Sequence, residues 1–398
     1  GGAANLWSIF PDALATYPEL LAEAGYITGR SGKGWGPGRM ETKGREPAGD
    51  RYKNFETFLA ARSIEAPFVY WLGSADPHRP YDKGSGAASG MDLSKVHLFG
   101  HFPDATAIRS DVADYYFEVQ RFDALVGSAL AQLAEIGELD NTIIVMTGDH
   151  GMPFPRCKAN LYDSGARVPL AVRWGAKVKG ERVLDDLVSL VDLAPTFLEA
   201  AGVPVPDDMT GRCLSTLLLS DEQGLVEPKR DHVLTGKERH VPCQEAPDRG
   251  GYPCRALRTQ DYLYIRNSTP ERWPAGTPHF EQATIPGVWL GDCDNGPTKT
   301  WLVENREKDE AHQRSWDWCF AKRPAEELYD LKKDPEQLHN VAGDPTYAEV
   351  QAKLAARLTE RLRATEDPRV LQPEEADAFF TNHPYYGRGP RHPSTTGQ

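Results

Sequence analysis

Asp149 and His150 stand next to each other between two glycines and offer a carboxylate oxygen and an imidazole nitrogen. Ligands of these two kinds hold divalent cations in proteins, and the flanking glycines would let the backbone come close to an ion. Alternatively, Asp149 caps a turn and His150 is simply exposed, and the two residues alone favour neither interpretation. A dication would need further acidic ligands, and Asp12, the one acidic residue before Glu19, belongs to the start of an expected helix.

Five cationic side chains form a second group, which could bind a tetrahedral oxyanion. They are Lys33, His78, Arg79, Arg156 and Lys158. Taken singly, each would more often be a solvated surface charge, but all five follow predicted strands, which favours a shared site. His78 lies on a loop stiffened by Pro77 and Pro80, so it could protonate a leaving group; a structural histidine with one backbone hydrogen bond is the alternative. The glycines around Lys33 resemble a phosphate-binding loop, but the spacing of a Walker loop is absent.

Strands and helices alternate through residues 1–243 and should place these side chains at one edge of a sheet. The unbroken apolar strands indicate an α/β domain with a mainly parallel sheet flanked by helices, and such sheets bind ligands beyond the carboxyl ends of their strands. The expected strands lie near Tyr26–Ile27 and at Phe68–Gly73, Asn141–Met146, Val168–Trp174 and Asp186–Val191, and the expected helices at 12–25, 110–137 and Leu193–Ala201.

Residues 244–398 are expected to form a smaller C-terminal α+β subdomain with an antiparallel sheet and a helix. Val233–Thr235 should be the last strand of the large sheet, and Arg255–Thr259 with Tyr262–Arg266 should form a hairpin around Gln260-Asp261. Residues 268–325 are rich in proline, glycine, tryptophan and charge, and predict long loops. A strand at Glu327–Leu331 and an amphipathic helix at Thr346–Ala364 follow.

Composition excludes several classes of protein. The 398 residues carry a formal net charge of −13, which argues against nucleic acid as the main partner. No apolar run is long enough to span a membrane. The six cysteines show no C-x-x-C spacing, so a zinc site is not expected. Cys243–Cys254 and Cys293–Cys319 could be disulfides of an exported protein, and buried free thiols are the alternative.

Five segments carry a resemblance to a known family. They are Gly32-Lys33, Asp76-Pro-His-Arg-Pro-Tyr81, residues 147–162, Asp192-Leu-Ala-Pro-Thr196 and residues 323–335. In this order they resemble the formylglycine-dependent sulfatases of the alkaline-phosphatase-like superfamily. The Pro-His-Arg loop and Gly151–Tyr162 are most similar to the sulfamidase (heparan N-sulfatase) group and its bacterial members.

The resemblance implies a role for each matching residue. Lys33 and Lys158 would bind sulfate oxygens, and His78 would bind sulfate and help to protonate the leaving oxygen or nitrogen. Asp149 and His150 would complete a calcium site with one ion. The implied substrate is a sulfated carbohydrate, and a periplasmic or secreted location and a formylglycine-generating maturation enzyme are expected with it. Sulfamidase has arginine at the position of Lys158, and lysine lacks the bidentate fork of that side chain.

Three departures from the family pattern change what is expected of this chain. Family members carry an Asp-Asp calcium pair and a Cys/Ser-x-Pro/Ala-x-Arg nucleophile motif before the Gly-Lys segment, where this sequence has neither. Cys254-Arg-Ala-Leu-Arg258 fits the motif literally, but it lies inside the expected hairpin and is interpreted as strand. Trp35 and Gly36 occupy the places where a histidine usually follows the lysine. The sequence therefore resembles a sulfatase without its N-terminal segment, which would carry the formylglycine, and the chain is expected to be catalytically silent by itself.

Further basic residues could contact the sugar. Arg79, Arg156, Lys237, Arg239 and His240 are the candidates for substrate binding, followed by Arg255 and Arg258. A solvated charge run is the alternative for each of the later ones. Two other functions stay open at this point: a phosphodiesterase or phosphonate hydrolase of the same superfamily, and a non-catalytic protein that binds sulfated glycans.

Overall fold

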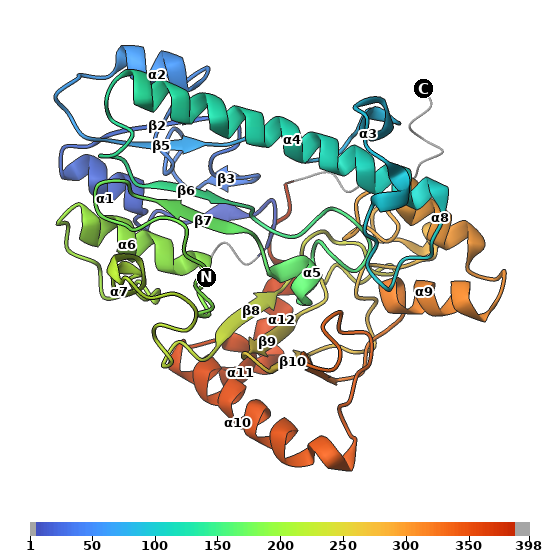
Figure 1. Ribbon diagram of the computed structural model, residues 1–398. Coiled ribbons are helices and arrows are strands. Elements are labelled where there is room, and N and C mark those ends of the chain that lie inside the picture. The colour runs from blue at the N-terminus through green and yellow to red at the C-terminus, as the bar shows by residue number, and fades with distance from the viewer. Residues whose placement is uncertain (1–4, 387–398) are drawn as a thin grey trace.

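A computed structural model describes residues 5–386 (Figure 1). The strands are β1 Ile9–Phe10, β2 Ile27–Ser31, β3 Arg39–Met40, β4 Asp50–Arg51, β5 Phe68–Leu72, β6 Ile144–Thr147, β7 Leu170–Arg173, β8 Val233–Lys237, β9 Cys254–Arg258, β10 Tyr262–Asn267 and β11 Glu326–Asp330. The helices are α1 Tyr17–Glu23, α2 Phe55–Ala61, α3 Ser85–Ala88, α4 Thr106–Glu135, α5 Asp163–Ala166, α6 Leu193–Ala200, α7 Ser215–Leu219, α8 Pro297–Asn305, α9 Glu310–Phe320, α10 Ala348–Ala364, α11 Pro368–Leu371 and α12 Pro373–Asn382.

The first half contains the expected parallel strands. β2 lies between β4 and β5, and both neighbours run parallel to it. Helix α2 packs on these strands through Phe55 and the fully buried Phe58. The approach is so close that a Cβ on Gly29 of β2 would come within 2.6 Å of the Phe58 ring, which requires glycine there. The long helix α4 runs across the top of this layer, as Figure 1 shows.

The strands β6 and β7 depart from a purely parallel arrangement. They pair antiparallel, with Ile144 opposite Arg173. The connection between them, residues 148–169, contains only the four-residue helix α5, whereas the crossover between two parallel strands usually contains a longer helix. Ile144, the first residue of β6, still packs into the same apolar cluster as Phe68 and Tyr70 of β5. The beginning of β6 therefore lies beside the parallel strands.

One expected strand of the first half is wrong. Residues 186–191 are not a strand: an isolated bridge joins Leu184 to Gly224, and a 3₁₀ turn covers Leu190–Asp192. The Asp186 carboxylate accepts backbone N–H groups of Val226 and Glu227 at 2.9 and 2.6 Å, so this segment is held by a side chain rather than by a ladder.

The C-terminal sheet is antiparallel, with the strand order β11–β10–β9–β8. The hairpin of β9 and β10 and the strand β11 confirm the expectation from sequence. β8, expected as the last strand of the large sheet, instead pairs antiparallel with β9. Helix α10 covers this sheet and packs Leu354, Leu358 and Leu362 against Leu257 and Tyr264. The boundary between residues 243 and 244 stays a prediction, since this sheet draws a strand from each side of it.

Residues 268–325 are not only loops, because α8 and α9 lie within them. Pro297 begins α8, and the Asp309 side chain accepts the backbone N–H of His312 at the start of α9. Both helices bury large side chains, among them Leu302, Trp316 and Phe320, in a core shared with α4 and Phe154. The prolines, glycines and charged residues around these two short helices led the composition of the segment to predict loops.

All six cysteines are free thiols in the structure, so neither suggested disulfide is present. Within the described part of the chain, no helix is both long and apolar enough to cross a membrane.

Candidate active site at the strand ends

The loops after β2 and β5 lie against each other. The two strands pair in register from Ile27 and Phe68 to Ser31 and Leu72, so both chains leave the sheet at the same edge. Gly32 has a φ of +60°, and Cβ atoms on Gly32 or Gly73 would collide with the backbone of the other loop. Glycine at both positions therefore brings Lys33 beside the loop that carries His78. Both side chains are exposed.

His78 has a defined orientation on its loop. Its Nδ1 lies 2.5 Å from the carbonyl oxygen of Arg79 and is thereby assigned the N–H that donates to it. The other ring nitrogen, Nε2, is then the atom that can take up and deliver a proton.

Asp149 and His150 follow β6 and form a pair. The Nε2 atom of His150 is 3.6 Å from Oδ1 of Asp149, and the Nδ1 atom lies 2.7 Å from the carbonyl oxygen of Gly151. A proton on Nδ1 leaves the Nε2 lone pair facing the carboxylate, which is how metal-binding histidines are oriented. Burial lowers the pKa of His150, which favours the neutral form that binds metals.

These two residues fit a divalent cation as two ligands of an incomplete set. Across residues 5–386, no group of three or more His, Cys, Asp or Glu side chains is placed to hold a metal ion. A cation bound here would need further ligands from beyond that group.

Lys158 lies close to the same pair and is anchored by a residue that the sequence analysis missed. Its Nζ donates to Oδ2 of Asp294 at 2.9 Å, and both side chains are largely buried. Burial raises the pKa of Asp294, but the positive charges of Lys158, His78 and His240 outweigh it, so the net pKa lies below its ordinary value. The charges of Lys158 and Asp294 also act on His150. His78, His150 and Lys158 therefore lie close enough to Asp294 for their charges to interact with its carboxylate.

A second aspartate, Asp292, holds two of the candidate substrate-binding residues. Lys237 Nζ lies 3.0 Å from Asp292 Oδ2, and His240 Nδ1 lies 3.6 Å from Oδ1 of the same carboxylate. Burial opposes the charges of Lys237 and Asp292, yet their attraction prevails: the pKa of Lys237 is raised and that of Asp292 is lowered. Lys237 and His240 thus both lie beside Asp292, and the charge of Lys237 is balanced by that carboxylate.

Arg79, a candidate for substrate binding, is held by internal contacts. Its two terminal nitrogens donate to the two carboxylate oxygens of Asp111 at 2.8 Å each, and its Nε donates to the carbonyl oxygen of Pro153. The same Asp111 accepts the backbone N–H and the hydroxyl of Thr298 on α8. Arg79 therefore joins the His78 loop, α4 and α8 through three of its five N–H donors.

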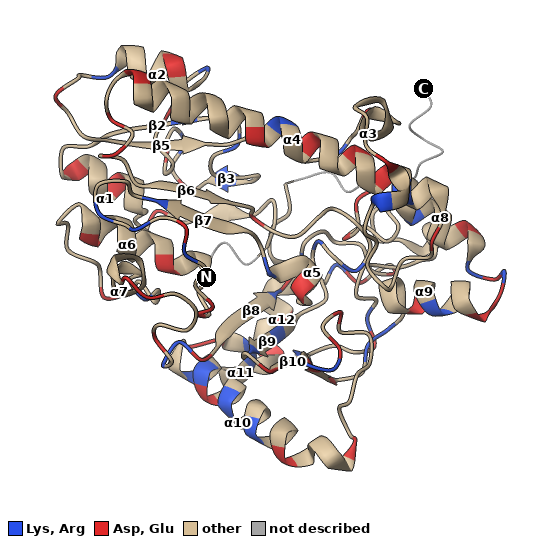
Figure 2. Cartoon of the chain, viewed as in Figure 1, with Lys and Arg blue, Asp and Glu red and all other residues tan. Residues whose placement is uncertain are grey.

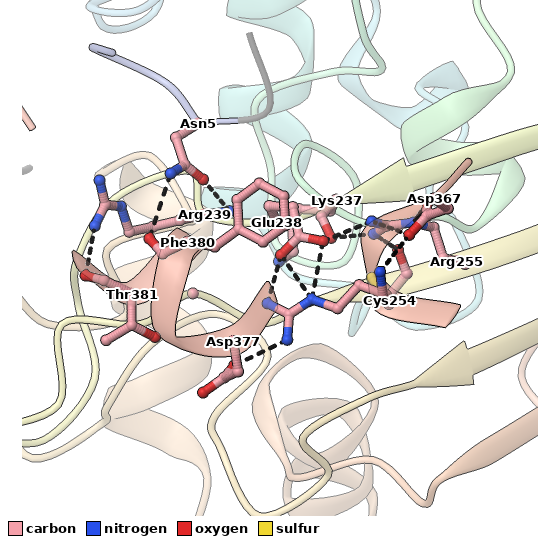
Figure 3. Close-up of polar contacts among 12 residues, drawn as sticks. Asn5, Lys237, Glu238, Arg239, Cys254, Arg255, Asp367, Asp377, Phe380 and Thr381 are labelled. Carbon is pink, nitrogen blue, oxygen red and sulfur yellow. Dashed lines mark hydrogen bonds and ion pairs between the residues drawn. The ribbon is translucent and has the colours of Figure 1, made fainter. Parts of the chain in front are cut away.

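Arg156 and Arg239, two further candidates for substrate binding, are also held by internal contacts. Arg156 is buried over the Tyr162 ring and donates to the carbonyl oxygens of Trp318 and Gln337. Figure 3 shows Arg239 held on the C-terminal side of the molecule, where it donates to the carbonyl oxygen of Thr381 at 3.2 Å and to further backbone carbonyls. Neither guanidinium can reach a substrate without breaking these buried bonds.

Arg255 and Arg258 are also internal contacts. Arg255 pairs with Glu238 and Asp367, as Figure 3 shows, and Arg258 pairs with Asp163. Trp35, which replaces the usual family histidine together with Gly36, packs its ring edge-on against Phe10 at 5.5 Å.

Three segments match the nucleophile motif literally. Cys254 begins β9, is buried, and has its pKa raised by burial to about 11, so it is a poor nucleophile near neutral pH. Two further matches, Ser268-Thr-Pro-Glu-Arg272 and Cys319-Phe-Ala-Lys-Arg323, escaped the sequence analysis.

Both of these further matches have structural contacts of their own. Ser268 follows β10, and Arg272 is bound to Asp248 and Asp377. Cys319 is buried near the end of α9, and Arg323 donates to the carbonyl oxygens of Asp317 and Trp318.

The two aspartates had a weak sequence signal. Asp292 and Asp294 flank Cys293 in a segment rich in glycine and proline, and no strand precedes them. Because they do not follow a strand, the position of strand ends could not identify them. Their close spacing in Gly291-Asp-Cys-Asp-Asn295 is the one sequence signal for a binding site.

Comparisons with known proteins agree with this arrangement. A family model described as Sulfatase matches residues 48–203. The N-sulphoglucosamine sulphohydrolase of Homo sapiens is 27% identical over 416 residues, which cover 91% of this chain and 76% of that protein. An ulvan-active sulfatase of Formosa agariphila is 29% identical over 284 residues, which cover 71% of this chain and 43% of that protein. The chain thus spans less than half the length of this second relative.

A solved structure extends the comparison to the fold. A protein determined in complex with its substrate, D-glucosamine-2-N,6-O-disulfate, superposes with a TM-score of 0.59 at 20% identity. The match covers 90% of this chain and 84% of that one, so the mixed parallel and antiparallel architecture is shared almost from end to end. The chain therefore resembles sulfatases over residues 48–203, and it shares the overall fold of the solved relative.

Proposed function

We propose that this site removes sulfate from a sulfated carbohydrate by hydrolysing a sulfuric ester or a sulfamate. The observation that carries the proposal is the convergence of Lys158, His78 and His150 around Asp294, beyond the ends of strands in a chain that resembles sulfatases. The names of the relatives, which refer to N-sulphoglucosamine and ulvan, support a sugar substrate.

Each residue would have a distinct task in the reaction. Lys158 keeps two N–H donors beyond its bond to Asp294, and with Lys33 it would neutralise and orient the sulfate oxygens. His78 would deliver a proton from Nε2 to the leaving oxygen or nitrogen, because its Nδ1 is engaged with a carbonyl. Asp149 and His150 would hold a calcium ion together with ligands from elsewhere; when bound, the ion polarises the reacting groups.

The remaining parts of the proposal concern the whole protein. A formylglycine at a position outside the described residues would supply the nucleophile that attacks sulfur, and a maturation enzyme would form it. The protein would act in the periplasm or outside the cell. The formylglycine and the location are both proposed from the resemblance to sulfatases.

The test is the release of free sulfate by the natural protein that contains this chain. D-glucosamine-2-N,6-O-disulfate is one substrate, and the matching phosphate monoester is the competitor. We expect sulfate release to exceed phosphate release and His78→Ala to lower kcat more than KM. Faster phosphate release would replace the proposal with a phosphate or phosphonate hydrolase.

A further inference from the structure

Lys299 is a fully buried ammonium that lies outside the residues described as reacting groups. The side chain is on α8, and the residue is 1% exposed. Its Nζ lies 3.2 Å from the carbonyl oxygen of Trp289 and 3.0 Å from those of Leu290 and Cys293. The side-chain oxygen of Asn295 is also 3.0 Å away. The three N–H donors of the ammonium therefore lie within hydrogen-bond distance of four oxygen atoms.

These four oxygens come from one short segment, residues 289–295, which we name the aspartate loop. It carries Asp292 and Asp294, which bind Lys237 and Lys158 respectively. Three lysines, Lys158, Lys237 and Lys299, surround this loop. Only Lys299 makes no hydrogen bond to a carboxylate. Lys299 thus binds the backbone of the loop, and the aspartates remain available to the site.

The other side of the aspartate loop is fixed by backbone contacts. The N–H groups of Leu290 and Asp292 donate to the carbonyl oxygens of Thr277 and Ala275 at 2.8 and 3.0 Å. A Cβ on Gly291 would approach Cys243 Cβ to 2.7 Å, so the loop is pressed closely on its neighbour. With these contacts on one side and Lys299 on the other, the two carboxylates have little freedom to move.

A buried ammonium is expensive to maintain. Burial lowers the pKa of Lys299, and the removal of a charged group from water costs free energy unless its donors are satisfied. A methionine of similar length would fill the same space without that cost. The ammonium must therefore be retained for the four bonds that it makes.

We propose that Lys299 is a positioning residue for the candidate site: it fixes the aspartate loop so that Asp294 orients Lys158 and Asp292 orients Lys237 for binding the sulfate group. The proposal rests on the function proposed above, because it concerns the same oxyanion. Lys299 itself would not touch the substrate.

The test combines Lys299→Met with a matched control, Arg230→Met, and uses two independent measurements. Arg230 is equally a buried cation, but it binds Asp192, Glu227 and a backbone carbonyl away from the aspartate loop. The first measurement is the alkylation rate of Cys293 under native conditions, read by peptide mass spectrometry with Cys254 as the internal reference. Both thiols are buried. The second is the affinity for inorganic sulfate, measured by calorimetry at a temperature where each variant is folded.

We expect Lys299→Met to accelerate alkylation of Cys293 but not of Cys254, and to weaken sulfate binding by about tenfold, as for outer residues that orient ligand-binding groups. Arg230→Met should lower the melting temperature without either effect. Unchanged labelling, or faster labelling with unchanged sulfate affinity, would overturn the proposal. Absence of sulfate binding by the unaltered chain would instead refute the proposed function. If Lys299→Met does not fold, Asn295→Ala removes one of the four oxygens and should produce the same two changes on a smaller scale.

Discussion

Asp294 and Asp292 determine how the basic residues of the site are presented. Each carboxylate binds one lysine, and His240 is near both. The sequence singled out Lys158, Lys237 and His240, but it could not identify their carboxylate partners, which lie more than 50 residues away along the chain. The candidate arginines Arg79, Arg156 and Arg239 instead donate to Asp111 or to backbone carbonyls.

Substitution of Lys158 tests its role as a sulfate ligand. Lys158→Met should weaken binding of inorganic sulfate by about ten- to a hundredfold, because a hydrogen bond to a charged group contributes about 1.5–3 kcal/mol. Lys158→Arg should restore most of the affinity. The control is Lys332→Met, which removes an exposed lysine paired with Asp261. Calorimetric titration measures the sulfate affinity of all three variants. Equal affinities of Lys158→Met and Lys332→Met would show that Lys158 does not bind sulfate.

Asp292→Asn should show a characteristic dependence of stability on pH. The pKa of Asp292 in the folded protein lies below its ordinary value of 3.8, so its charge stabilises the fold at higher pH. That contribution is lost as the pH falls through the folded-state pKa. The difference in free energy of unfolding between wild type and variant should therefore be largest near neutral pH and shrink below pH 3.8. A difference that stays constant in urea titrations on both sides of this pH would contradict the assignment.

At the scale of elements, the parts with strong periodicity were predictable. The long helix α4, the hairpin β9–β10 and the amphipathic α10 follow their apolar patterns closely. The paired ends of β2 and β5 also appear as the sequence predicts, and with them the neighbouring loops of Lys33 and His78. The partners of short strands were not predictable, because β8 carries no signal that distinguishes one sheet from the other. Helices α8 and α9 depend on tertiary packing for their position.

Arg79 links three elements, so its loss should be a stability defect. Arg79→Met leaves the carboxylate of Asp111 buried without its ion pair, and should reduce the free energy of unfolding by about 3–5 kcal/mol. As a control, Lys95→Met breaks only the pair with the exposed Asp92 and should cost about 1 kcal/mol or less. Urea unfolding compares the two variants. Similar losses in both would mean that the Arg79–Asp111 pair does not join the elements as described.

At the scale of the whole molecule, the site gathers lysines on a protein of net charge −13. Figure 2 shows acidic residues in most elements and basic residues along α10. Local carboxylates hold the basic residues of the site in place, so the site can bind an anion although the molecule as a whole repels one.

The 398-residue chain by itself should release no sulfate. Its three literal matches to the nucleophile motif are buried or held by structural contacts, and the metal ligands within residues 5–386 form an incomplete set. Incubation of the isolated chain with calcium and a sulfated sugar, followed by ion chromatography of free sulfate, checks this expectation. Release above the rate of the buffer, abolished by His78→Ala, would show that the chain holds a nucleophile of its own.

The most direct test of the site is a crystal structure of the chain with D-glucosamine-2-N,6-O-disulfate. The account predicts one sulfate group within hydrogen-bond distance of Lys158 Nζ and His78 Nε2, with Lys33 beside it and Asp294 still bound to Lys158. A sugar bound elsewhere, for instance along the basic side chains of α10, with Lys158 and His78 untouched, would contradict it.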